Sequence, residues 1–98
     1  MYRHGDVLLI PVNEVPADLH PKAGAVVAYG EVTGHAHRLL MDGLLYEAED
    51  GTVYIRAPQD TAITHEEHGT IPLPAGLYRV SYQREYAPYE QAVRQVLD

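Results

Sequence analysis

The stretch TVYIRAPQDTAITH, residues 52–65, decides the fold class of this chain. In its first part, Thr52–Ala57, apolar and polar side chains alternate, which is typical of a β-strand with one buried and one solvated face. The Pro-Gln-Asp sequence at 58–60 predicts a turn, and Thr61–His65 predicts a second strand because β-branched residues favour extended structure. The stretch therefore indicates β-structure, with no helical periodicity.

The same alternation of short β-type runs and turn signals extends in both directions along the chain. Further strands are predicted at Asp6–Val12, Ala25–Thr33, His35–Met41, Leu44–Ala48 and Leu77–Tyr86. Asp42-Gly43 and Asp50-Gly51 are dipeptides typical of tight hairpin turns. Prolines at 16 and 21 predict a loop over 13–24, and prolines at 72 and 74 predict another before Gly76. The tail from Pro88 fits a short helix or a final strand equally well.

At 98 residues the chain has the length of one domain, since single domains contain roughly 100–150 residues. We therefore expect a single all-β domain over residues 1–98. Regularly spaced short strands, each followed by a turn signal, favour a small β-barrel or β-sandwich, either cupin-like or another small barrel.

Composition excludes several classes of function. Acidic residues outnumber basic ones by 14 to 7 and give a net charge of −7, which disfavours binding to a nucleic-acid backbone. The chain has no cysteine, so any metal must be held by nitrogen and oxygen ligands. No run approaches the roughly 20 apolar residues of a membrane span, and the first residues lack a signal-peptide layout, so we expect a cytoplasmic protein that does not contact membranes.

Histidine placement is the feature that points to chemistry. His35 and His37 lie two residues apart on one predicted strand and share a face about 7 Å apart. That face continues as Leu39 and Met41, which are apolar, so both histidines should point inward. His65 and His68 lie at the end of a second strand, where His65 shares the face of the apolar Ile63. These pairs predict one cluster of imidazoles at the end of the core.

Three or four imidazoles with a carboxylate nearby are the ligand set that Zn, Ni, Mn or Fe(II) prefers. We therefore expect His35, His37, His65 and His68 to bind a divalent transition metal. Glu66 or Glu67 would be a further ligand, an acceptor for an imidazole N–H, or a general base acting on a metal-bound water. His4 is a further candidate ligand.

Other interpretations stay open at this stage. The histidines could act without metal as general acid and base of a ribonuclease or phosphodiesterase, with Arg38 or Arg84 stabilising charge. The tyrosines of the last strand, from Tyr78 to Tyr86, could serve a binding or accessory module that assembles into a homo-oligomer, although they equally fit core aromatics. A structural role for each histidine, with no site at all, is the simplest alternative; His20, between Leu19 and Pro21, should be solvent-exposed.

Two resemblances bear on these alternatives. Residues 30–37, GEVTGHAH, resemble the first half of the cupin metal motif, and Pro74-Ala75-Gly76 resembles the turn of its second half. Cupins place a Glu shortly after the histidine pair and another His after that turn, whereas here the nearest downstream acid is Asp42, and His65 and His68 precede the turn. The resemblance implies metal-dependent oxygen, isomerase or hydrolytic chemistry on a small molecule.

The chain as a whole is similar to a group of short bacterial and phage proteins that share the runs HGDV, GEVTGH and THEEHG, at residues 4–7, 30–35 and 64–69. This resemblance implies no particular activity.

Overall fold

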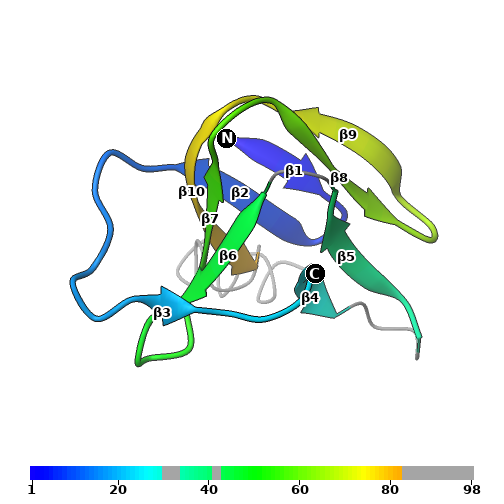
Figure 1. Cartoon of the computed structure of the whole chain (residues 1–98). Coiled ribbons are helices and arrows are strands. Elements are labelled where there is room, and N and C mark those ends of the chain that lie inside the picture. Colours follow the sequence, from blue (N-terminus) through cyan, green and yellow to red (C-terminus); the bar gives the residue numbers. More distant parts are fainter. Residues whose placement is uncertain (30–33, 41–42, 83–98) are drawn as a thin grey trace, which may run out of the picture.

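The structure is a computed structural model that describes residues 1–29, 34–40 and 43–82. In this part of the chain the backbone forms β-strands and no helix (Figure 1). The strands are β1 (Tyr2–His4), β2 (Val7–Pro11), β3 (His20–Pro21), β4 (Val26–Tyr29), β5 (Ala36–Leu39), β6 (Leu44–Glu47), β7 (Val53–Ala57), β8 (Thr61–His65), β9 (Gly69–Leu73) and β10 (Gly76–Tyr82). Because no described residue is helical, the described part contains no helix able to cross a membrane.

The strands form two antiparallel sheets that face each other across one core. One sheet has the order β1-β2-β10-β7-β6-β3, and the other has the order β4-β5-β8-β9 (Figure 1). The all-β prediction is confirmed, as two packed sheets. Strand pairing among the described residues does not close them into a barrel.

Both sheets contribute side chains to the core. Ile55 of β7 and Ile63 of β8 are fully buried, and Leu73 of β9 packs in the same cluster. The predicted alternation in β7 is confirmed, because Ile55 points inward while Arg56 is exposed. Tyr78 of β10 is a core aromatic, and its hydroxyl donates a hydrogen bond of 2.6 Å to the Pro74 carbonyl.

The hairpin predicted at Asp42-Gly43 is wrong. β5 pairs with β4 and β8 in one sheet, whereas β6 pairs with β7 and β3 in the other, so the chain crosses between sheets here. Gly43 approaches Leu39 so closely that an added Cβ would lie 2.0 Å from its Cδ2. Glycine at this position is therefore explained by close packing. The hairpin at Asp50-Gly51 is confirmed, since it joins β6 to β7 and Gly51 has a φ of 90°.

Two segments predicted as loops contain strands. Residues 69–73 form β9 although Pro72 lies within it, and His20 and Pro21 form β3. Both are edge strands, where a missing N–H costs no ladder hydrogen bond if it faces outward. β1 was not predicted from the sequence. The tail from Pro88, Met41 and the predicted strand end at 30–33 lie outside the described residues.

Candidate functional site

Five of the six histidines gather where the β1-β2 hairpin meets one end of the four-stranded sheet. They are His4, His35, His37, His65 and His68, which we call the histidine cluster. His65 lies at its centre, with its ring centroid 4.4 Å from that of His37 and 4.6 Å from that of His68. The centroids of His35 and His4 are 5.7 and 6.1 Å from that of His65.

Two glycine turns bring these side chains together. His4 ends β1, and Gly5, with a φ of 65°, begins the two-residue turn into β2. An added Cβ on Gly5 would lie 2.6 Å from the His68 ring, so only glycine leaves room for it. His65 ends β8, and a three-residue turn carries His68 and closes at Gly69, which has a φ of 69°.

A chain of hydrogen bonds fixes the ring of His37. His4 Nε2 lies 2.8 Å from the Gly69 carbonyl oxygen, and His4 Nδ1 lies 2.8 Å from His37 Nδ1. A carbonyl can only accept, so His4 Nε2 carries the proton and, in the neutral ring, His4 Nδ1 accepts. His37 Nδ1 is then the donor, and His37 Nε2 carries the free lone pair.

That lone pair is buried and unsatisfied. His37 is 0% exposed, and its Nε2 has no hydrogen-bond partner among the described residues. The nearest charged group is Asp6, whose Oδ1 lies 3.8 Å away, too far for a hydrogen bond. Two acceptors thus face each other across a gap with no donor between them.

His65 has the opposite polarity. Its Nδ1 accepts hydrogen bonds from the backbone N–H groups of Glu67, at 3.0 Å, and His68, at 3.4 Å. In the neutral ring its Nε2 therefore carries the proton, and this buried donor has no partner among the described residues. For His65 Nε2 to bind a metal, its proton would have to move to Nδ1, which would then give up both backbone hydrogen bonds.

Burial favours the neutral form of two imidazoles, those of His37 and His4. Loss of hydration lowers the pKa of His37 to about 4, helped by the charges of neighbouring histidines and opposed by Asp6. Burial also lowers the pKa of His4, although its hydrogen bond to Gly69 acts in the other direction. The inner imidazoles are thus free bases at neutral pH, the form in which imidazole binds metals.

The solvent side of the cluster carries two carboxylates with different partners. Glu67 Oε1 lies 2.9 Å from His35 Nδ1, which is the distance of an ion pair although the two groups lack the alignment of a hydrogen bond. Glu66 accepts from the Ala36 backbone N–H at 2.9 Å and from Arg38 Nη1 at 2.8 Å. The Ala36 hydrogen bond, with Arg38 adding to it, lowers the pKa of Glu66 to about 2. Glu66 thus ties the β8-β9 turn to β5.

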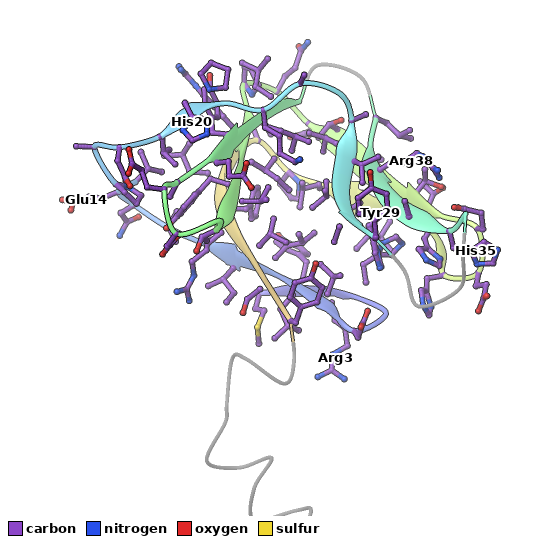
Figure 2. All side chains as sticks on the ribbon, turned by 90° about the horizontal axis from the view of Figure 1, so that it is seen from below. Arg3, Glu14, His20, Tyr29, His35 and Arg38 are labelled. Carbon is purple, nitrogen blue, oxygen red and sulfur yellow. The ribbon has the colours of Figure 1, made fainter. Side chains whose placement is uncertain are left out.

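The structure brings all four predicted ligands, His35, His37, His65 and His68, into the cluster. His20 lies on β3 and is exposed, as expected, at the opposite end of the molecule from His35 (Figure 2). Asp6 was missed. The only signal for it was its position beside Gly5 in HGD, which places Asp6 in the same tight turn that presents His4.

The cluster as it stands is not a complete metal centre. No three of the described His, Asp or Glu side chains are arranged to hold an ion together. Two imidazoles bound to one tetrahedral ion through bonds of about 2 Å have ring centres about 5 Å apart. The centroid distances from His65, 4.4 to 6.1 Å, bracket that value.

A family model covers most of the chain. It is described as Domain of unknown function (DUF8820) and matches residues 3–83. The chain belongs to this family. The match includes the whole histidine cluster, so the cluster lies within the family domain. No curated protein and no solved structure shows significant similarity to the chain, and the cupin resemblance has no support from these comparisons.

Proposed function

We propose that the histidine cluster binds one divalent transition metal. One observation carries the proposal: the buried lone pair of His37 Nε2 faces the Asp6 carboxylate across 3.8 Å. Two acceptors in this arrangement are stabilised by a cation between them. Two metal bonds of about 2 Å at a tetrahedral angle place their nitrogen and oxygen about 3.3 Å apart, so a small movement of the exposed Asp6 carboxylate toward His37 would let both atoms bind one ion.

The hydrogen bonds behind His37 support the same interpretation. A metal-binding imidazole usually donates its other N–H to a carbonyl, a carboxylate or a neighbouring group, which fixes the tautomer and the ring orientation. His37 donates through Nδ1 to His4, and His4 in turn donates to Gly69. The relay leaves His37 Nε2 as the ligating atom.

His65 and His68 could supply further ligands. Their ring centroids are 4.4 and 6.0 Å from that of His37. His68 is exposed, while His65 would have to give up its backbone hydrogen bonds to bind the metal. A set of imidazoles and one carboxylate, without thiolate, suits Zn, Ni, Mn or Fe(II).

The solvent side of the cluster bears on whether the site is catalytic. A divalent ion bound there would supply Lewis-acid chemistry, as in metal-dependent hydrolases. Glu67 is exposed, while Glu66 is held by Arg38 and has a strongly lowered pKa. Because the Ala36 N–H and Arg38 hold Glu66 as a carboxylate, we propose Glu67, the exposed carboxylate beside His35, as the general base.

The opposite tautomers of His37 and His65 favour a second candidate function, acid–base catalysis without a metal. His37 Nε2 has a free lone pair and could take up a proton as general base, while His65 Nε2 carries a proton and could serve as general acid once the His65 ring is protonated to imidazolium. This is the arrangement that a metal-free phosphodiesterase needs. Arg38 would stabilise the developing charge poorly, because Glu66 already pairs with it.

Calorimetric titration of the tag-free protein with Zn²⁺ and Ni²⁺ tests the metal proposal. We expect about one equivalent to bind, and His37→Gln to weaken binding at least tenfold because it removes the ordered nitrogen ligand. The matched control is His20→Gln, which changes an exposed histidine outside the cluster and should bind like the parent protein. Binding that is absent, or equal in both variants, contradicts the proposal.

The two candidate functions separate with bis(nitrophenyl) phosphate as the probe. Hydrolysis that EDTA abolishes and Zn²⁺ restores supports the metal. Hydrolysis that persists in EDTA and disappears in His65→Gln supports acid–base catalysis without metal and excludes the metal mechanism.

A further inference from the structure

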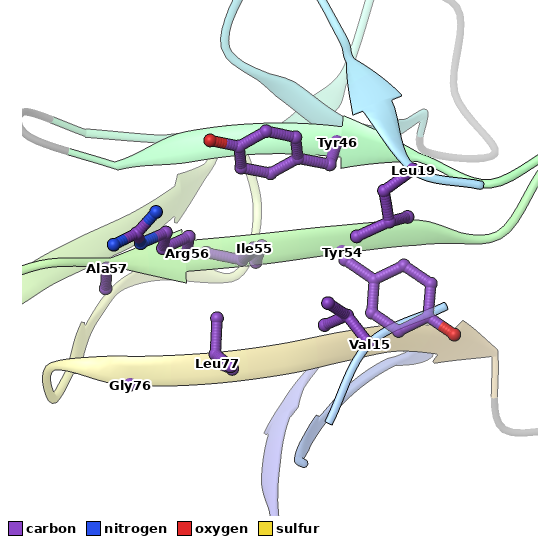
Figure 3. Close-up of a pocket in the computed structure, with 9 residues that line it drawn as sticks. All are labelled: Val15, Leu19, Tyr46, Tyr54, Ile55, Arg56, Ala57, Gly76 and Leu77. Carbon is purple, nitrogen blue, oxygen red and sulfur yellow. The ribbon is translucent and has the colours of Figure 1, made fainter. Parts of the chain in front are cut away.

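A second concave site lies away from the histidine cluster, on the outer face of the six-stranded sheet. It has a volume of about 530 Å³, and its floor is formed by β6, β7 and β10 (Figure 3). Tyr46 and Tyr54 face each other as register partners, and Leu77 is the partner of Arg56 on the next strand. Val15 and Leu19, from the segment between β2 and β3, form the wall above them.

Hydrogen bonds hold this wall in place. At one end, the Val12 N–H donates to the Leu77 carbonyl at 3.0 Å. At the other end, β3 pairs with β6, and Asp18 accepts a hydrogen bond of 3.0 Å from the Glu49 backbone N–H. Because the segment is fixed on both sides of Val15, the pocket is preformed. Its volume lies within the range of about 300–1,000 Å³ that is usual for small-molecule sites.

The pocket has a polar end and an apolar end. The guanidinium of Arg56 and the hydroxyl of Tyr46 point toward the same end, whereas Val15 and the ring of Tyr54 lie at the other (Figure 3). No described residue makes a hydrogen bond or ion pair with the Arg56 side chain. None of the described residues that line the pocket is acidic, although the chain has a net charge of −7.

We propose that this pocket binds a small organic anion with an apolar body. Arg56 and the Tyr46 hydroxyl take the anionic group, since a guanidinium binds carboxylate, sulfonate or phosphate oxygens through paired N–H donors. Leu19, Leu77 and the Tyr54 ring enclose the apolar body. Binding here uses none of the residues of the histidine cluster.

Two fluorescent probes that differ in one group test the proposal. Anilinonaphthalene sulfonate carries the anion, and N-phenylnaphthylamine has the same ring system without it. We expect the sulfonate to bind saturably to the folded protein and Arg56→Gln to weaken it about tenfold, which corresponds to one charge-assisted contact. Binding of the neutral probe should be unchanged in Arg56→Gln. Arg3→Gln, which removes an exposed cation on β1, is the matched control.

Leu19→Asp supplies the second arm, because it places a like charge in the apolar wall and should abolish binding of the sulfonate. Near-ultraviolet circular dichroism of the tyrosines confirms that each variant is folded. The proposal is overturned if the sulfonate does not bind saturably, if Arg56→Gln binds it as the parent does, or if Leu19→Asp leaves its affinity unchanged.

Discussion

At the scale of single residues, His37 combines complete burial with a lone pair that nothing in the described structure satisfies. A group in this state is costly for folding unless it gains a partner. His65 shows the same burial with the opposite polarity. The chemistry of the cluster depends on this difference, because one ring presents an acceptor where its neighbour presents a donor.

The lowered pKa of His37 predicts acid sensitivity. Folding lowers this pKa from 6.5 to about 4, so below pH 6.5 the unfolded chain binds a proton that the folded chain does not. Stability should fall as pH drops from 6.5 toward 4 and should be unaffected by this group above that window. The shift corresponds to roughly 3 kcal/mol at most, on the scale of 1.36 kcal/mol per pKa unit.

Urea denaturation of the metal-free protein across this pH window measures the effect. His37→Gln should flatten the pH dependence, whereas His20→Gln, at an exposed site, should leave it unchanged. Below that window Glu66 acts in addition, since its pKa is lowered to about 2 and its stabilising contribution is lost as the carboxylate protonates. Equal slopes for the parent and His37→Gln between pH 6.5 and 4.5 would show that His37 titrates normally.

At the scale of elements, the turn between β1 and β2 can be tested separately from the rings. Gly5→Ala should destabilise the fold by about 1 kcal/mol or more through its positive φ, and should also displace the His68 ring, which an added Cβ would approach to 2.6 Å. Gly51→Ala has the same backbone cost at a φ of 90° but meets no atom within 4 Å. The NMR signals of the His68 ring should shift in Gly5→Ala and should stay unchanged in Gly51→Ala.

The contact between Glu66 and β5 predicts a local effect. Glu66→Ala removes the acceptor of the Ala36 N–H, so amide hydrogen exchange at Ala36 should accelerate, while the global stability should change little because the Glu66–Arg38 pair is exposed. Glu49→Ala is the control, since the backbone N–H of Glu49, and not its side chain, donates the hydrogen bond to Asp18. If the Ala36 amide exchanges at the same rate in Glu66→Ala as in the parent protein, Glu66 does not link the β8-β9 turn to β5.

The positions of β7 and β8 could be predicted from the sequence, because apolar and polar side chains alternate there and this alternation reflects which side chains are buried. Local sequence pattern gave wrong predictions where contacts between residues distant in the sequence determine the structure. Pro72 signals a loop, yet it lies in an edge strand where its missing N–H is tolerated. Asp42-Gly43 signals a hairpin, yet the flanking strands belong to different sheets, which depends on partners distant in the sequence.

At the scale of the whole molecule, the histidines of two strands were predictable as one cluster because the inward faces of their strands carry apolar neighbours such as Ile63 and Leu39. The contribution of Asp6 was not predicted, and His4 was only a further candidate, because β1 is three residues long and carries too little pattern to predict a strand. The turn between β1 and β2 lies against the four-stranded sheet because β1 pairs with β2 and because His4 forms a hydrogen bond with Gly69.

Binding at the cluster also has a consequence for the whole fold. The cluster joins residues of both sheets, so a bound ion would add a link between them, and a ligand that binds only the folded state raises its stability. Zn²⁺ or Ni²⁺ should therefore raise the Tm of the parent protein and of His20→Gln, and should leave the Tm of His37→Gln nearly unchanged.

The most direct test of the metal proposal is elemental analysis of the purified, tag-free protein alongside the His35→Ala/His37→Ala double variant. We predict about one equivalent of a transition metal in the parent protein and a large loss of it in the double variant. A parent protein that contains no transition metal, and whose Tm does not respond to added Zn²⁺, Ni²⁺ or Mn²⁺, would contradict the proposal.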